Sequence, residues 1–351
     1  MKSWRRTGSR FAVIVTAALL ASHCERGREP LAPAWHAFAE RFVEAGRVVD
    51  RDNGAVSHSE GQGYGMLFAV ASGDRDGFDR LWRWSQRVLR RPDGLFSWRY
   101  APCPTRDRAC VDDPNNASDG DLLIAWALLR AGERWDEPAY TRQALSIAAA
   151  IAGALLREDH GYLFLLPGAE GFEERTAAGT RYRLNLSYYV FPALRDLAAR
   201  TGDPRWTRLA DDGERLLRRA RFGERGLHPD WLYLGADGPA LGDDAVYGYN
   251  ACRIPLHVVW AVSRAATLLA PYRAFWAGAQ PPPATLDLVS GEPAAYGWDA
   301  GMAGIARTVR WRLGDAPPPA PVGAGEVRDA DGYYAASLLL LSGLARQDLA
   351  P

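Results

Sequence analysis

Several residue types that are typical of particular classes of protein are rare in this sequence. Its 351 residues include a single lysine, Lys2, only four cysteines and only three methionines. So few cysteines in a chain of this length exclude a disulfide-dense miniprotein. No Cys-x-x-Cys pair occurs and the six histidines are scattered, so the usual zinc-site spacings are missing too. We therefore expect no metal site, structural or catalytic.

A net charge is also lacking, because 42 basic residues balance 42 acidic ones. Proteins that bind the phosphate backbone of nucleic acids carry an excess of positive charge. Beyond the N-terminal segment no basic run occurs. We therefore expect no nucleic-acid partner.

Long apolar runs are scarce, and the one that stands out is short. Residues 11–22 are apolar and follow four basic residues within the first ten. This pattern is typical of a secretory signal and is too short to span a bilayer comfortably. We expect a signal peptide or lipoprotein signal over residues 1–24 and an exported protein, periplasmic or secreted. Membrane contact would come only through an N-terminal anchor at Cys24, although His23 is a poor neighbour for that processing; an ordinary N-terminal core helix is the alternative.

Export bears on the remaining cysteines. Cys103 and Cys110 lie in a polar, proline-containing stretch and could pair in an oxidising compartment. Cys252 would then be left as a free thiol.

What the chain does have is a helical rhythm and many aromatic residues, with 13 Trp and 14 Tyr. Alternating strand patterns are scarce, and residues 162–167 and 231–234 are at most short strands. Ten to twelve helices without a parallel-sheet rhythm predict an all-α fold, in one domain over residues 31–347. The segments with helical spacing are 34–46, 62–72, 76–90, 119–132, 138–156, 187–200, 204–220, 251–269, 298–311 and 331–346.

Three polar clusters interrupt this apolar pattern, each with glycines and each at the start of an expected helix: residues 57–66, 115–121 and 247–255. Each also has a purely local interpretation. Ser57 and Glu60 have the spacing of a capping box. Ser118 or Asp119 could be the N-cap of the next helix. The third cluster could be a satisfied polar patch.

Together the clusters belong to six motifs that lie in a consistent order over about residues 34–347: SEGQGYGM (59–66), SWRY (97–100), NNASDGDLLIAWAL (115–128), RLNLSYYVFPAL (183–194), PDW (229–231) and YNACRIPLHVVW (249–260). With these motifs the chain resembles glycoside hydrolase family 8, especially the exported endoglucanases associated with bacterial cellulose synthesis. The resemblance implies an (α/α)6 barrel, a toroid of six helical hairpins. It also implies a monomeric enzyme that needs no cofactor and cleaves a β-1,4-linked polysaccharide with inversion, glucan being favoured over xylan and chitosan.

In the family's reaction an acid protonates the leaving oxygen while a base on the opposite face activates water. Glu60 matches the acid, and its pKa would have to be raised by burial among neighbours such as Tyr64 and Trp98. Trp98 is also the best candidate for stacking on sugar rings, with Tyr64, Tyr189 and Trp231 plausible. Four other tryptophans have helical spacing among aliphatic residues and are expected in the core: Trp82, Trp84, Trp126 and Trp260.

Three further residues match roles of the family. Asp119 matches the aspartate that holds the distorted sugar at the cleavage subsite. Tyr188 matches a tyrosine that helps to place the attacking water. Arg253 matches an arginine that orients the base.

The sequence departs from the family at the base itself. Many relatives read Tyr-Asp-Ala where this chain has Asn250 between Tyr249 and Ala251. An amide can bind a water but cannot receive its proton. Either Asn250 only positions the water and the enzyme is slow, or the chain binds glucan without cutting it, or another carboxylate is the base, with Asp113, Asp119, Asp243 and Asp244 as candidates.

Overall fold

The computed structural model describes residues 31–350 apart from 105–109, 178, 264 and 279. The expected signal segment, residues 1–24 with Cys24, lies outside the described residues. Within them, no helix combines the length and apolarity needed to cross a membrane.

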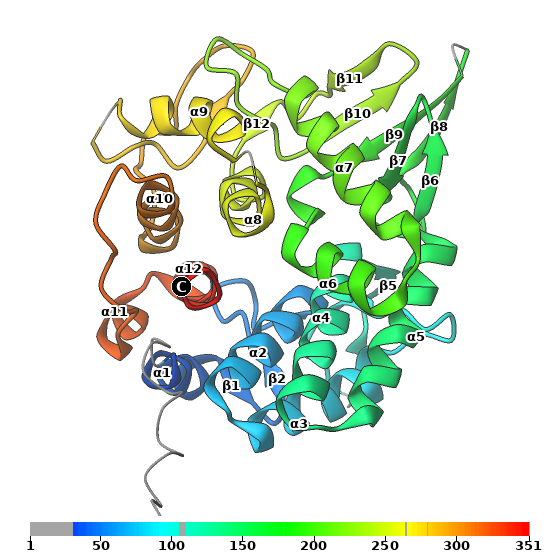
Figure 1. Ribbon diagram of the computed structural model, residues 1–351, viewed down its shortest axis with the longest axis vertical. Coiled ribbons are helices and arrows are strands. Elements are labelled where there is room, and N and C mark those ends of the chain that lie inside the picture. Colours follow the sequence, from blue (N-terminus) through cyan, green and yellow to red (C-terminus); the bar gives the residue numbers. More distant parts are fainter. Residues whose placement is uncertain (1–30, 105–109, 178, 264, 279, 351) are drawn as a thin grey trace, which may run out of the picture.

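Twelve α-helices run through the described part of the chain (Figure 1). Their bounds are α1 Ala32–Phe42, α2 Ser59–Ser72, α3 Arg75–Trp84, α4 Ser118–Arg134, α5 Pro138–Ala154, α6 Phe191–Thr201, α7 Pro204–Arg219, α8 Ile254–Ala261, α9 Ala265–Trp276, α10 Ala300–Arg312, α11 Ala324–Asp329 and α12 Gly332–Leu349. Each even-numbered helix contacts the next even-numbered one, and α12 contacts α2. The even-numbered helices therefore form a closed inner ring.

The odd-numbered helices lie outside this ring, each against a helix of the ring (Figure 1). The two sets differ in sequence for this reason. In the inner helix α12, residues 338–341 are four consecutive leucines, all at most 1% exposed, because neighbours surround the helix. In the outer helix α3, Phe78 and Leu81 are buried, whereas Asp76 and Arg80 on the opposite side are exposed. The strongest amphipathic patterns in the sequence belong to two outer helices, α3 and α7.

The described residues confirm the prediction of a helix-rich fold, and they also contain thirteen short strands. The strands are two to six residues long and lie in the connections between helices, so a period-two pattern had little length in which to show. Their bounds are β1 Val43–Glu44, β2 Arg47–Val48, β3 Ser57–His58, β4 Ser97–Tyr100, β5 Asp113–Asn116, β6 Leu156–Asp159, β7 Tyr162–Leu165, β8 Glu173–Thr176, β9 Gly179–Leu184, β10 Leu232–Gly235, β11 Gly238–Leu241, β12 Val246–Tyr247 and β13 Leu286–Asp287. The short strands expected near 162–167 and 231–234 are β7 and β10.

All the strand pairs are antiparallel. The largest sheet has the order β11-β10-β9-β8. The sheet that matters for the site has the order β3-β4-β5. Strand β3 leads directly into α2, and β5 leads through one residue into α4. Pairing of β3 and β5 with the shared strand β4 therefore brings the starts of α2 and α4 together.

The connection from β4 to β5 carries a disulfide bond between Cys103 and Cys110, which confirms the expected pairing. Cys252 is a free, buried cysteine. The bond joins the residues that follow β4, the strand that carries Trp98, to the residues that precede β5.

Candidate active site

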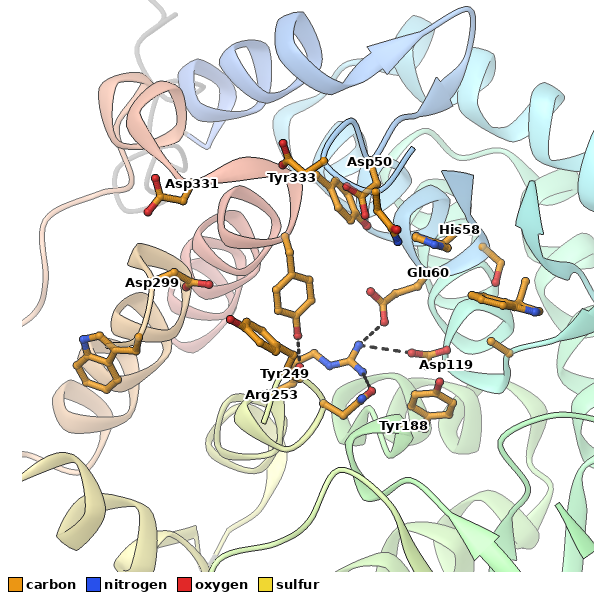
Figure 2. Close-up of a pocket in the computed structure, with 18 of the residues that line it drawn as sticks. Asp50, His58, Glu60, Asp119, Tyr188, Tyr249, Arg253, Asp299, Asp331 and Tyr333 are labelled. Carbon is orange, nitrogen blue, oxygen red and sulfur yellow. Dashed lines mark hydrogen bonds and ion pairs between the residues drawn. The ribbon is translucent and has the colours of Figure 1, made fainter. Parts of the chain in front are cut away.

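A cavity of about 1110 Å³ opens where the helix starts of the inner ring meet the loops before α10 and α12. Figure 2 shows its charged centre, where Glu60, Asp119 and Arg253 face one another. His58 lies to one side of this centre and Asp299 to the other. The cavity thus continues in both directions from the carboxyl pair.

Glu60 and Asp119 occupy equivalent places, each as the second residue of its helix. A glycine at position 120 allows the two helix starts to approach. A Cβ atom there would lie 2.8 Å from the backbone nitrogen of Glu60 and would overlap the hydroxyl of Ser59. The amide groups of both helix starts also point toward the pair and favour negative charge there.

The local capping interpretations of these clusters are wrong. Ser57 lies in β3 and its hydroxyl donates to the carbonyl of Val48. The N-cap positions of α2 and α4 are His58 and Ala117, and neither helix has a side-chain cap. The carboxyl groups of the first turn are therefore not used for capping.

Arg253 connects the two carboxyl groups. It is 3% exposed, and its Nη1 group ion-pairs with Glu60 and lies 3.4 Å from Oδ2 of Asp119. The same Nη1 group donates to the hydroxyl of Tyr64 at 3.1 Å. A buried cation between a buried and a partly exposed carboxyl stabilises one negative charge fully, because a second would lack a partner.

The pKa values of the pair follow from this arrangement. Burial alone would raise the pKa of Glu60, but the charge of Arg253 and a hydrogen bond with Asp119 outweigh it and lower that pKa below its ordinary value. The expectation of a raised pKa for Glu60 was therefore wrong. Burial, and then the charge of Glu60, raise the pKa of Asp119 well above its ordinary value. Asp119 is therefore the member of the pair that holds a proton more readily.

The orientation of Asn250 is fixed by its neighbours. Its Oδ1 atom accepts hydrogen bonds from Nη2 of Arg253 at 2.9 Å and from Nδ2 of Asn185 at 3.0 Å. Asn185 is itself oriented, because its Oδ1 accepts from the backbone and hydroxyl groups of Ser187. Asn250 lines the cavity, and its amide NH2 group has no partner among the described residues. The amide of Asn250 therefore presents a hydrogen-bond donor to the cavity, and a donor cannot accept a proton as a base does.

A buried carboxylate holds the backbone of this segment. Oδ1 of Asp230 accepts from the N–H groups of Gly248, Asn250 and Ala251 at 3.0, 3.1 and 2.7 Å. A Cβ at position 248 would lie 2.7 Å from Oδ2 of Asp230, so glycine is required there. In the sequence, Asp230 was recognised only as part of the PDW motif, and no role was predicted for it.

Two of the expected sugar-contacting residues line the cavity, namely Trp98 and Tyr188. The ring of Trp98 is stacked on that of His58, with centroids 5.7 Å apart and planes 5° from parallel. His58 therefore backs Trp98 and leaves the remainder of its surface for the cavity.

Three expected stacking residues do not line the cavity, so those predictions are corrected. Tyr64 is fully buried with its hydroxyl against the guanidinium, so it supports the arginine and cannot stack on a sugar. Tyr189 is 1% exposed. Trp231 is stacked on Phe172 and covered by Arg183, whose guanidinium lies 4.6 Å from the ring centroid. The tryptophans expected in the core are buried there: Trp82, Trp84, Trp126 and Trp260.

The four carboxylates proposed as bases do not stand opposite Glu60. Asp119 is hydrogen-bonded to Glu60, far closer than the separation of inverting pairs. Asp113 lies in β5 outside the residues that line the cavity. Asp243 and Asp244 line a separate, smaller cavity beside Trp231.

The cavity is acidic to a degree that the sequence did not indicate. Arg253 and His58 are its basic residues. Among the described residues no group of three or more acidic, histidine or cysteine side chains is placed to hold a metal ion. Beyond the carboxyl pair, the acidic residues that line it are Asp50, Asp52, Asp299 and Asp331.

Comparison with known proteins agrees with the geometry. The family described as glycosyl hydrolases family 8 matches residues 9–348. A probable endoglucanase of Novacetimonas hansenii is 39% identical over 329 residues, which are 91% of this chain and 92% of that protein. Solved structures of a family 8 endoglucanase from Klebsiella pneumoniae and of an endo-β-1,4-glucanase from Acetobacter xylinum each superpose with a TM-score of 0.81 at 38% identity. They cover 90% and 91% of this chain, and 99% and 98% of their own. The chain therefore belongs to glycosyl hydrolases family 8 and is a glycoside hydrolase of the endoglucanase class.

Proposed function

We propose that the protein is an exported endo-β-1,4-glucanase that hydrolyses cellulose or a related β-glucan with inversion. The observation that carries the proposal is that Glu60 and Asp119 meet at Arg253, midway along a cavity that continues on both sides. Such a cavity suits the interior of a polymer chain. The N-terminal signal pattern and the disulfide support export, since disulfides persist in oxidising compartments.

In this mechanism Glu60 protonates the glycosidic oxygen as the bond breaks. It receives its proton from Asp119 across their hydrogen bond when a bound chain excludes water. Both carboxyls are then negative, and Arg253 stabilises this charge until one of them takes up a proton from solvent after product release. The glycosidic oxygen leaves as a hydroxyl group.

Water attacks the anomeric carbon from the opposite face, where Tyr188 and the amide of Asn250 hold it. Because Asn250 donates and cannot accept, the proton of this water passes to solvent. We infer that this step limits the rate, which makes the wild-type enzyme slow.

We also interpret the closed inner ring with its outer helices as the (α/α)6 barrel. The alternation of odd and even helices and the contact of α12 with α2 support that interpretation.

The function is tested by incubating the purified protein with mixed-linkage β-glucan, carboxymethylcellulose, xylan and chitosan. We expect reducing ends from the β-glucans, and a fall in viscosity that precedes them, as random internal cuts produce. Proton NMR of early products should show the α-anomer first, as inversion requires. Binding of cello-oligosaccharides without cleavage of any polymer would instead support a glucan-binding protein.

Replacing Asn250 with aspartate should raise kcat on β-glucan at least about tenfold, which is about 1.4 kcal/mol of barrier. One carboxylate oxygen keeps the hydrogen bonds from Arg253 and Asn185, and the other takes the place of the amide NH2 and can accept the proton of water. Steady-state kinetics of the two proteins measure the change.

The matched control is Asn115→Asp, the same substitution outside the cavity, which should leave kcat unchanged. An unaltered or lower rate for Asn250→Asp would mean that the amide is not limiting and that another group removes the proton.

A further inference from the structure

Asp121 is a buried carboxyl group that neither lines the cavity nor takes part in the proposed proton transfers. Its Oδ1 atom accepts a hydrogen bond from the backbone N–H of Phe96 at 2.8 Å, and its Oδ2 atom accepts one from Nδ2 of Asn116 at 2.7 Å. Burial raises the pKa of Asp121 to about 7, while the hydrogen bonds from Asn116 and from Phe96 lower it. Because a buried carboxyl group is costly unless donors satisfy its oxygens, these two hydrogen bonds hold the group in place.

The two donors come from the strands that lead into the cavity. Phe96 directly precedes β4, whose second residue is Trp98, and Asn116 is the last residue of β5. Asp121 itself lies in the first turn of α4, two residues after Asp119. Trp98 lines the cavity from the strand, and Asp119 lines it from the helix. One carboxyl group therefore connects the strand of Trp98 to the helix start of Asp119.

The hydrogen bonds around Asp121 require an acceptor at this position. Oδ1 of Asn116 accepts from the N–H of Ala169 at 2.7 Å, so the NH2 group of Asn116 faces Asp121. Phe96 offers its backbone N–H, which is also a donor. An amide side chain at position 121 would place its NH2 group against a donor in either orientation. A rotation of the Asn116 amide would only move the conflict to the N–H of Ala169.

We propose that Asp121 is a positioning residue of the hydrolysis, which fixes the strand of Trp98 relative to the helix start of Asp119. Its loss lets the strand and the helix move independently, so that a chain bound at Trp98 no longer meets the carboxyl pair in the reacting geometry. The inference rests on the proposed function, because it takes Trp98 to contact the glucan and Asp119 to lie at the reacting centre.

The first variant is Asp121→Asn, which keeps the size of the side chain but replaces one acceptor with a donor. We expect kcat on mixed-linkage β-glucan to fall and KM to rise, so that kcat/KM is about 100-fold lower, the loss that a misplacement of about 1 Å produces. Steady-state kinetics measure the change, and circular dichroism verifies folding.

The exchange variant combines Asn116→Asp with Asp121→Asn and tests the match of donors and acceptors itself. The carboxylate at position 116 accepts from the N–H of Ala169 and from the NH2 group at position 121, and the amide oxygen at position 121 accepts from the N–H of Phe96. Every donor again has an acceptor, so kcat and KM should return to within about threefold of wild type.

The matched control is Asp212→Asn. Asp212 is likewise a buried carboxyl group of a helix that accepts from a strand, namely from the N–H of Leu163 in β7 at 2.8 Å. Among the described residues, those of α7 and β7 lie outside the lining of the cavity. This variant should have a lower melting temperature and unchanged kcat and KM.

Wild-type kcat and KM in folded Asp121→Asn would overturn the inference, because the hydrogen bonds would then serve stability alone. An exchange variant that folds but keeps the low kcat/KM of Asp121→Asn would overturn it too. If Asp121→Asn does not fold, the folded exchange variant decides: wild-type kcat and KM support the inference, and a much lower kcat/KM refutes it.

If the wild-type protein cleaves no glucan, the proposed function fails, but calorimetric titration with cellohexaose still tests the positioning of Trp98. Weaker binding by Asp121→Asn that the exchange restores supports the inference, and unchanged binding refutes it.

Discussion

Replacement of Glu60 with glutamine should lower kcat on a β-glucan by about 10³-fold, within the range observed for the loss of general acid catalysis. Glutamine preserves the size of the side chain and can still hydrogen-bond to Asp119, but it has no proton to give to the departing oxygen. KM should change little, because the rest of the cleft is intact. Steady-state rates measured from reducing ends, with circular dichroism to verify folding, provide the comparison.

The same variant has a more selective readout. A cellobioside with a dinitrophenyl leaving group departs without protonation, so Glu60→Gln should lose far less activity on this substrate than on glucan. Glu44→Gln, at an exposed ion pair with Arg51, is the matched control and should behave as wild type. Full activity of Glu60→Gln on glucan would remove Glu60 as the acid.

Replacement of Arg253 with methionine should lower kcat at least about 100-fold and destabilise the fold by roughly 3 kcal/mol at pH 7. The methionine fills much of the space but leaves Glu60 and Asp119 buried without a cation, and it releases the amide of Asn250. Glucan hydrolysis and urea unfolding measure the two effects. Arg273→Met, which removes an exposed ion pair with Asp315, should cost less than about 1 kcal/mol.

The destabilisation by Arg253→Met should also depend on pH. In the wild type the pKa of Glu60 lies below its unfolded value, so its contribution to stability is present above about pH 4.5 and is lost as the pH falls through the folded pKa. Without Arg253 burial raises that pKa, and the variant becomes less stable as the pH rises. The difference in unfolding free energy between wild type and variant should therefore be larger at pH 7 than at pH 4. A difference independent of pH would mean that the arginine acts through packing alone.

The helices could be predicted from the sequence because each is long enough to show its period. The strongly amphipathic pattern of α3 and the leucine run of α12 both indicate a helix, one half-buried and one buried all round. Strands such as β3 and β12, of two residues each, carry no period and could not be found. They can be recognised only in the structure, where each lies beside its partner strand.

The sequence predicted which residues make up the candidate site, but it did not predict how their pKa values shift. Glu60, Asp119 and Arg253 were found from motifs at helix starts, and the structure brings them together. The direction of the pKa shift of Glu60 was missed, because it depends on an ion pair with a residue 193 positions away. Asp230 was missed for a similar reason, since its role appears only when a distant loop is placed beside it.

The closure of the inner ring by α12 has a consequence for biosynthesis. This helix contacts α2, and its first turn supplies Tyr333 and Tyr334 to the wall of the cleft. In a nascent chain that still lacks α12, the apolar side of α2 would be exposed and the cleft would lack part of its wall, even if the earlier helical hairpins had folded. The ring can therefore close only after α12 has been synthesised. We expect incomplete chains that lack this helix to need chaperones.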